Sequence, residues 1–267
     1  MRKMRDYNTK DMGDNPEKTV LNWHDAHCHL FNVAEDYNLE LMLSESRKKG
    51  ISGWLSNALN KEEVHWHVQN SIPGMHFSAG IHPVYDAGTT LTLDELETLC
   101  KEQKIFAIGE IGLDKNNRNT AQQLTLLKDQ LSLARAYDLP VVFHIIGHYD
   151  LFYKALSDLP VKGIWHGFYA PVEIVRQFSK FDMTFSLGSV LIHSLKHEIV
   201  NAVIKHGNYL VETDAPYNLS KQSIVNEPGQ NPLIKLLVLN NMVSRMNGVK
   251  IESLNQDLLK NIRQYIK

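Results

Sequence analysis

The chain has 267 residues, of which 43% are hydrophobic and 22% charged, and its formal net charge is −2. This composition is that of an ordinary globular protein long enough to bury one large core. The near-neutral charge argues against tight, salt-driven binding to long duplex nucleic acid. No run reaches the roughly 18 apolar residues that span a bilayer, so no membrane partner is expected. The two cysteines lie far apart in the chain, which predicts a reducing, cytoplasmic location and no disulfide framework.

Residues 1–21 are mostly polar and lack the apolar centre of a signal peptide. We predict that they form an extension that precedes one domain spanning residues 22–267. No obligate protein partner is inferred from the sequence.

Short apolar runs then alternate with longer amphipathic ones, which predicts repeated βαβ units and a parallel sheet. Eight strands are expected, the number that a closed (β/α)8 TIM barrel requires. A doubly wound open sheet is the rival fold, but no glycine-rich phosphate loop follows the first strand. The predicted strands are Trp23–His29, Ile51–Asn57, His76–Ile81, Ile105–Glu110, Val141–His144, Gly163–His166, Met183–Leu187 and Tyr209–Thr213.

Helices are expected between these strands. Thr92 is predicted to cap a helix whose third residue is Glu95, the spacing of a capping box. Pro171 suits the first turn of another helix, Pro171–Phe178. Further helices are predicted at Leu39–Lys48, Ala121–Tyr137, Asn231–Met246 and Ile251–Tyr265.

Residue types that bind metal ions stand at the ends of several predicted strands. His27 and His29 alternate along the first strand, so both side chains can point to one face, with Asp25 available as a supporting partner. A similar pair, His65 and His67, falls in an expected helix, where such residues diverge, and is assigned no role. Cys28 is expected to be a core residue.

Glu110, His144 and His166 end the predicted strands four, five and six, and Asp214 follows the eighth. Each of them alone has an ordinary structural reading, such as an ion pair, a buried hydrogen bond or, for Asp214, a turn before Pro216. Their order along the chain makes a chance explanation of the whole set weak. Converging at the carboxyl end of a barrel, they would form a site for one or two divalent cations.

These residues lie in segments that resemble the TatD family of metal-dependent hydrolases, within the amidohydrolase superfamily. The resemblance covers nearly the whole chain from about Asp25 onward, and its Gly-Glu-Ile-Gly-Leu-Asp and Glu-Thr-Asp-Ala-Pro segments are the most specific. The matching segments are Asp25–Leu30, Gly80–Pro83, Gly109–Asp114, Leu139–His144, His166–Phe168, Glu212–Tyr217 and Asn226–Pro228.

The resemblance implies a set of roles. His27, His29 and Asp214 would hold one cation, and His144 and His166 a second, with Glu110 bridging. Asp214 and Glu110 would be the catalytic residues. His82 would bind substrate, and Glu212 is expected to be a structural ion-pair residue. The implied cofactors are two divalent ions per chain, Mg²⁺, Mn²⁺ or Zn²⁺.

The resemblance also implies a deoxyribonuclease that cleaves phosphodiester bonds in DNA with a metal-activated water. Three departures weaken the choice of DNA. Ile146 stands where the family commonly has an arginine, His166-Gly167-Phe168 replaces a His-Cys-Phe motif, and only Lys221 remains of a basic run. His148 could partly replace the arginine. The alternatives are therefore a TatD-like hydrolase of a small ester, amide or phosphoester, and a non-catalytic metal-binding scaffold.

Overall fold

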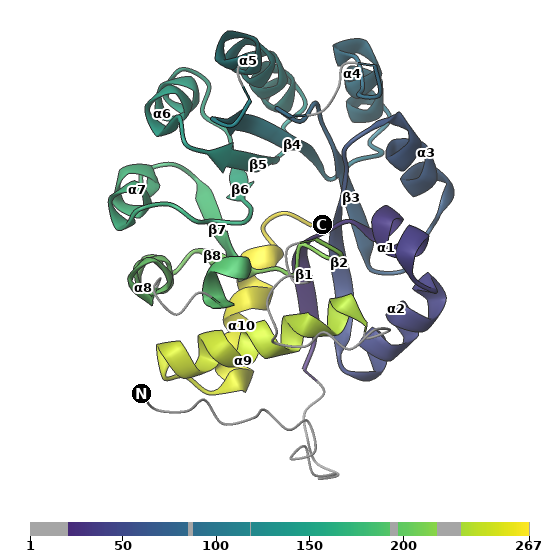
Figure 1. Cartoon of the computed structure of the whole chain (residues 1–267), viewed down its shortest axis with the longest axis vertical. Helices are drawn as coiled ribbons and strands as arrows, with labels where there is room; N and C mark the ends of the chain where they lie inside the picture. The colour runs from purple at the N-terminus through teal and green to yellow at the C-terminus, as the bar shows by residue number, and fades with distance from the viewer. Residues whose placement is uncertain (1–20, 85–87, 118, 193–196, 218–230, 267) are drawn as a thin grey trace.

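The computed structural model describes residues 21–84, 88–117, 119–192, 197–217 and 231–266. Its eight strands are parallel neighbours in chain order and form a near-closed barrel, as predicted (Figure 1). Their bounds are β1 Trp23–Cys28, β2 Ile51–Ala58, β3 Met75–Ala79, β4 Ala107–Asp114, β5 Val141–Ile146, β6 Gly163–Trp165, β7 Met183–Leu187 and β8 Tyr209–Val211.

The helices lie around the outside of these strands (Figure 1). The capping box at Thr92 and Glu95 is present, whereas Pro171 lies one residue before its helix rather than inside it. The α-helices are α1 Leu30–Asp36, α2 Leu39–Lys48, α3 Lys61–Gln69, α4 Leu93–Lys101, α5 Thr120–Ala136, α6 Tyr149–Asp158, α7 Val172–Phe178, α8 His197–His206, α9 Lys235–Asn247 and α10 Ile251–Ile262, and the short 3₁₀ helices are η2 Ser189–Ile192 and η3 Pro232–Ile234.

The barrel closes between its first and last strands at their carboxyl ends. Cys28 and Ala215 form an isolated parallel bridge. The backbone N–H of His29 donates to the Ala215 carbonyl at 2.7 Å, and the N–H of Asp214 donates to the His27 carbonyl at 2.9 Å. This closure brings residues almost 190 positions apart in the sequence next to each other.

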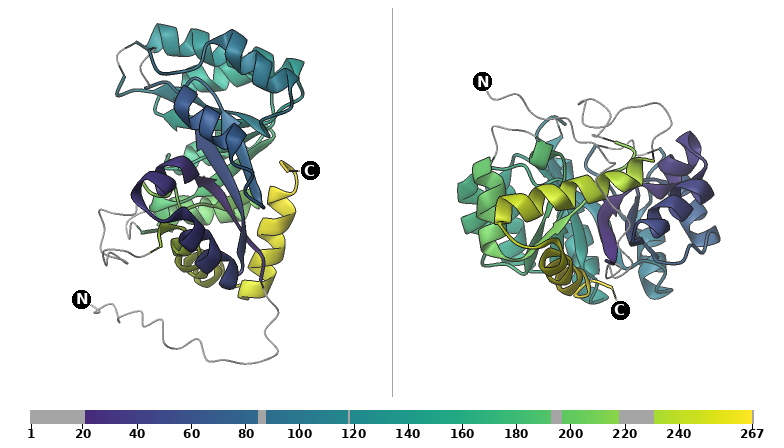
Figure 2. Two further views of the ribbon diagram at one scale, coloured as in Figure 1. Left: turned by 90° about the vertical axis from the view of Figure 1, so that its right-hand side faces the viewer. Right: turned by 90° about the horizontal axis from the view of Figure 1, so that it is seen from below.

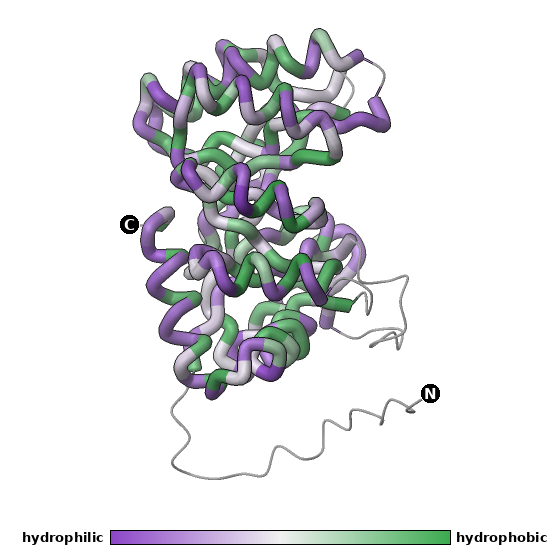
Figure 3. Tube along the Cα trace, turned by 90° about the vertical axis from the view of Figure 1, so that its left-hand side faces the viewer, coloured by the Kyte–Doolittle hydropathy of each residue, from purple (hydrophilic) through white to green (hydrophobic). Residues whose placement is uncertain are grey.

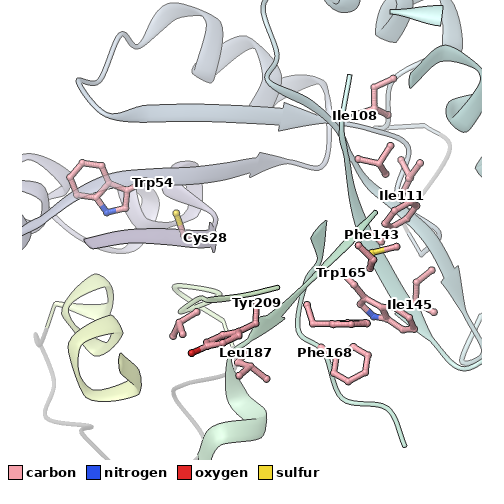
Figure 4. Packing of buried hydrophobic residues seen from close by; sticks show 14 of the residues in the cluster. Cys28, Trp54, Ile108, Ile111, Phe143, Ile145, Trp165, Phe168, Leu187 and Tyr209 are labelled. Carbon is pink, nitrogen blue, oxygen red and sulfur yellow. The ribbon is translucent and has the colours of Figure 1, made fainter. Parts of the chain in front are cut away.

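The largest core lies between the strands and the surrounding helices. Apolar residues run through the inner parts of the trace and alternate with polar residues along the outer helices, so strands and helices have apolar side chains to bury against each other (Figure 3). Large aromatic side chains fill the space outside β5 to β7 (Figure 4). Trp165 packs edge-on against Phe152 and Phe168, with ring centres 5.2 and 5.0 Å apart. Such rigid packing fixes the strands whose ends bear the polar residues.

A second, smaller core closes the amino end of the barrel. Leu55, Ile164 and Leu210 meet Ile262 and Tyr265 there. The Tyr265 hydroxyl donates to the Gly163 carbonyl at 2.9 Å, at the start of β6. Helices α9 and α10 lie side by side next to β1 and β8 (Figure 2). The chain therefore seals one end of the barrel with apolar side chains and leaves the polar residues at the other.

No helix in the described ranges is both long and apolar enough to cross a membrane. The predicted extension lies outside the described residues except for Leu21. The Asn226–Pro228 segment and Lys221 also lie outside them.

Candidate metal centre

The six residues predicted to bind metal converge at the carboxyl end of the barrel. On the side of β1, the His27 and His29 Nε2 atoms lie 3.2 Å apart. The Asp214 Oδ1 atom is 3.6 Å from the His27 Nε2 and 3.3 Å from the His29 Nε2. The three side chains offer ligand atoms around one point, in the combination expected for the first cation.

A second group forms around β5 and β6. The His144 Nδ1 and the His166 Nε2 lie 3.1 Å apart. The Glu110 Oε2 is 2.9 Å from the His166 Nε2 and 3.6 Å from the His144 Nδ1. His82, predicted to bind substrate, joins this group, with its Nε2 at 3.8 Å from the same oxygen.

Glu110 connects the two groups through its two oxygens. Its Oε1 lies 3.3 Å from the His27 Nε2 and 3.5 Å from the His29 Nε2, whereas its Oε2 faces His144 and His166. The rings of His27 and His166 stack with centres 3.9 Å apart, so the two groups share one compact space.

The donor atoms fit cations better than they fit one another. The His27 and His29 nitrogens face each other, as do those of His144 and His166, and each pair can form at most one hydrogen bond. Within the described part of the chain, the Glu110 Oε1 is buried without a hydrogen-bond partner. Buried polar atoms normally find partners, and nitrogen and carboxylate ligands at this spacing suit a divalent ion.

The local backbone departs from the predicted strand ends in ways that aim these side chains. Glu110 lies inside β4, which continues to Asp114, and the β4–β5 register shifts between Gly109 and Ile111. Such an irregularity re-aims a side chain within a strand. Strand β8 ends at Val211, and Asp214 follows with a φ of 55°, in the left-handed region that Asp tolerates better than most residues.

Buried polar residues that the sequence analysis missed hold the histidine rings. The Asn57 side-chain Nδ2 lies 3.0 Å from the His27 Nδ1, and the Asn57 backbone carbonyl oxygen lies 3.2 Å from the His29 Nδ1. The Asp114 Oδ2 is 3.4 Å from the His144 Nε2. Asn57 is the last residue but one of β2, and Asp114 is the last residue of β4. A polar residue at the carboxyl end of a buried strand is the signal that could have identified both.

Glu212 and Asp25 also support the centre, in ways that the sequence did not specify. The Glu212 Oε1 accepts a hydrogen bond from the Gly167 N–H at 2.6 Å and lies 3.8 Å from the His166 Nδ1. Among the described histidines, none has an imidazole nitrogen in contact with Asp25. Asp25 accepts hydrogen bonds from the Thr213 N–H at 2.9 Å and from the Thr213 hydroxyl, and thereby holds the segment that bears Asp214.

The charges of the group reinforce one another. Burial by itself raises the pKa of Glu110, but the adjacent His166 and His27 rings hold it well below its usual value. Burial by itself lowers the pKa of His166, but Glu110 and Glu212 raise it well above its usual value. The pKa of Asp214 is likewise lowered, against its burial, by its hydrogen bond to His29. The Glu110 and Asp214 carboxylates are therefore ionised at neutral pH, and a bound cation would take the place of the proton on His166.

The mouth of the site near these residues includes apolar and aromatic side chains. Ile146, at the position of the family's arginine, is 37% exposed, and Tyr217 is 41% exposed. The Tyr217 ring meets the His29 ring edge-on, with centres 5.1 Å apart. His148 is the N-cap residue directly before α6, and its Nε2 lies 3.3 Å from the Thr120 hydroxyl.

A parallel eight-stranded barrel with this histidine and carboxylate cluster at its carboxyl end defines a class, the metal-dependent hydrolases. The family model of the TatD related DNases matches residues 24–267, and the chain belongs to that family.

Its relatives include an uncharacterized metal-dependent hydrolase of Methanocaldococcus jannaschii, 24% identical over 91% of this chain and 96% of the relative. A 3'-5' ssDNA/RNA exonuclease TatD of a Pantoea species is 30% identical over 68% of this chain and 75% of the relative. The crystal structure of the TatD homolog YjjV from Escherichia coli has a TM-score of 0.78 at 23% identity, and the match covers 92% of this chain and 98% of that one.

Proposed function

We propose that this protein hydrolyses phosphodiester bonds in DNA, at single strands or strand ends, with two divalent cations. The observation that supports it best is the position of Glu110, whose two oxygens face different sets of histidines. A carboxylate in that position can bridge two ions. Two ions held by these residues would supply Lewis acidity to a phosphoryl group and lower the pKa of water.

The roles of the residues follow from their places in the cluster. His27, His29 and Asp214 would hold one ion and His144 and His166 the other. The Asp214 carboxylate, ionised and 9% exposed, would orient the attacking water and accept its proton. His82, 8% exposed beside Glu110, would contact a substrate phosphate oxygen.

The ligand set and the proposed chemistry favour different ions. Four histidines favour Zn²⁺ or Mn²⁺, whereas phosphoryl chemistry and the family resemblance favour Mg²⁺. Asn57 and Asp114 would orient the rings of His27 and His144 for either choice.

A second candidate function has an observation of its own. Ile146 and Tyr217 present apolar surface at the mouth, and the arginine that would contact phosphate is missing. This favours a hydrolase of a small ester, amide or phosphoester. The relative from Pantoea is named for action on single-stranded nucleic acid, which supports the DNA reading.

The test is cleavage of an end-labelled single-stranded DNA oligonucleotide with Mg²⁺, Mn²⁺, Zn²⁺ or a chelator. Asp214→Asn should reduce the rate by at least about a hundredfold, in the range of a lost general base. Asp158→Asn, at an exposed position at the end of α6, is the matched control and should leave the rate unchanged.

Three outcomes separate the candidates. Unchanged cleavage by purified Asp214→Asn contradicts the role of that carboxylate. Turnover of small esters by a metal-loaded wild type that leaves DNA intact favours the second candidate. A metal-loaded protein that cleaves neither substrate supports the scaffold reading.

A further inference from the structure

We propose that a neutral pocket beside the metal centre binds an uncharged, hydrogen-bonding ring of the substrate, namely the nucleobase of the terminal nucleotide. This inference rests on the proposed function, because it names how a nucleotide would be recognised at the same site. The pocket lies where the segment after β3 meets the first turns of α5.

The pocket shares a wall with the metal centre. Its volume is about 340 Å³, within the range of about 300–1,000 Å³ that is usual for small-molecule sites. His82 lines it, and the same ring lies 4.4 Å from the ring of His144 and reaches toward Glu110. A group bound in the pocket would therefore be separated from the cluster by one imidazole ring.

The pocket contains a buried hydroxyl with no partner among the residues that the structure describes. Thr90 is 7% exposed and lines the pocket, and its Oγ1 forms no hydrogen bond with any of them. An unsatisfied buried hydroxyl costs stability, so a partner that arrives with the ligand explains its presence better than packing does. The Thr90 hydroxyl can both donate and accept, as the mixed edge of a nucleobase requires.

Neutral polar and apolar side chains form the rest of the lining. None of the described residues around it is a lysine, arginine, aspartate or glutamate. Leu91 and Leu126 offer apolar surface to the faces of a ring, and Gln122 stands exposed at the rim. Asn117 is already anchored, because its Nδ2 donates to the Pro83 carbonyl at 2.6 Å. The wall is thus held in place before any ligand binds.

This chemistry favours a nucleobase over a second phosphate. A buried anion needs a cation or several donors, and the described lining residues supply no permanent positive charge. Ile146 stands where an arginine would contact a substrate phosphate. Binding of an uncharged nucleobase in this pocket would offer another way to hold the substrate. The preference for a nucleoside would come from this pocket, and the chemistry from the metal centre.

The experiment compares two chromogenic diesters with the same leaving group, bis(p-nitrophenyl) phosphate and the p-nitrophenyl ester of thymidine 5'-monophosphate. The ratio of their kcat/KM values measures what the nucleoside adds. Thr90→Val removes the hydroxyl at constant shape and should lower the ratio about three- to tenfold, the value of one hydrogen bond. The melting temperature of this variant should be unchanged or higher.

A second variant blocks the pocket from its rim. Gln122→Trp should lower the ratio at least as far, because the indole ring would occupy the space that the nucleobase needs. Ser132→Trp, at an exposed position further along α5 and outside the lining, is the matched control and should leave the ratio unchanged.

Turnover of both diesters with a ratio that neither variant changes overturns the pocket proposal and leaves the proposed function standing. Turnover of neither diester by the metal-loaded wild type overturns the proposed function, and the pocket proposal with it.

Discussion

At the scale of single residues, the metal centre depends on the side chains that hold the histidines as much as on the histidines themselves. Asn57 is fully buried and connects several parts of the site. Its side-chain Nδ2 faces the His27 ring, its backbone carbonyl faces the His29 ring, and its Oδ1 accepts a hydrogen bond from the Ser78 hydroxyl at 2.6 Å. The side-chain amide thus restrains the His27 ring and ties β2 to β3, while the backbone of the same residue restrains the His29 ring.

Asn57→Ala should weaken metal binding by about 10- to 100-fold, because the His27 ring loses the partner that fixes its orientation. Isothermal titration of the metal-free protein with Mn²⁺ or Zn²⁺ measures the effect. Asn70→Ala, at the end of α3 and away from the cluster, is the control. Equal affinity in wild type and Asn57→Ala would remove the orienting role from this amide.

At the scale of elements, α3 is attached to the end of β2 by a buried histidine. The His67 Nδ1 donates to the Glu63 carbonyl at 2.7 Å, so its Nε2 is left to accept a hydrogen bond from the Ser56 hydroxyl, also at 2.7 Å. Ser56 in turn accepts a hydrogen bond from the Leu30 N–H, next to His29. The helix therefore supports the strand end from which Asn57 projects.

This contact makes stability depend on pH. Burial lowers the pKa of His67 from 6.5 to about 4. Because the folded-state pKa is depressed, the stabilisation is fully present above pH 6.5 and is lost as the pH falls through about 4. The shift corresponds to at most about 3 kcal/mol.

Urea unfolding of metal-free protein at pH 7, 6, 5 and 4 tests this prediction. The wild type should lose more stability on acidification than His67→Gln, in which no ring titrates. His65→Gln, at an exposed position on the same helix, should follow the wild type. Parallel pH profiles for wild type and His67→Gln would contradict the assignment.

At the scale of the whole molecule, the two ends of the barrel differ in kind. The amino end is filled by Leu55, Ile164, Leu210 and the C-terminal Tyr265, whereas the carboxyl end concentrates buried carboxylates and imidazoles. Burying so many ionisable groups is unfavourable without compensation. A bound cation would satisfy them and stabilise the entire barrel.

Saturating metal should therefore raise the free energy of unfolding, by about 4 kcal/mol at a thousand times the dissociation constant. Thermal unfolding with excess cation and with a chelator measures the difference. Glu110→Gln, which removes the shared carboxylate, should abolish most of the metal-dependent rise. Identical melting temperatures of the wild type in both conditions would rule out a tightly held ion.

The eight strands and most helices could be predicted from the sequence, because hydrophobic periodicity and caps act over a few residues. The candidate ligands could be found for the same reason, since polar residues that end apolar strands stand out locally. The tertiary structure decided what depends on contacts between distant segments. The shift in the β4–β5 register decided how Glu110 is aimed within β4. The closure of β1 against β8 brought His27 next to Asp214, and the packing of the segment after β3 placed Thr90 in a pocket beside His82. Such contacts are set by strand register and barrel closure, and no local pattern encodes them.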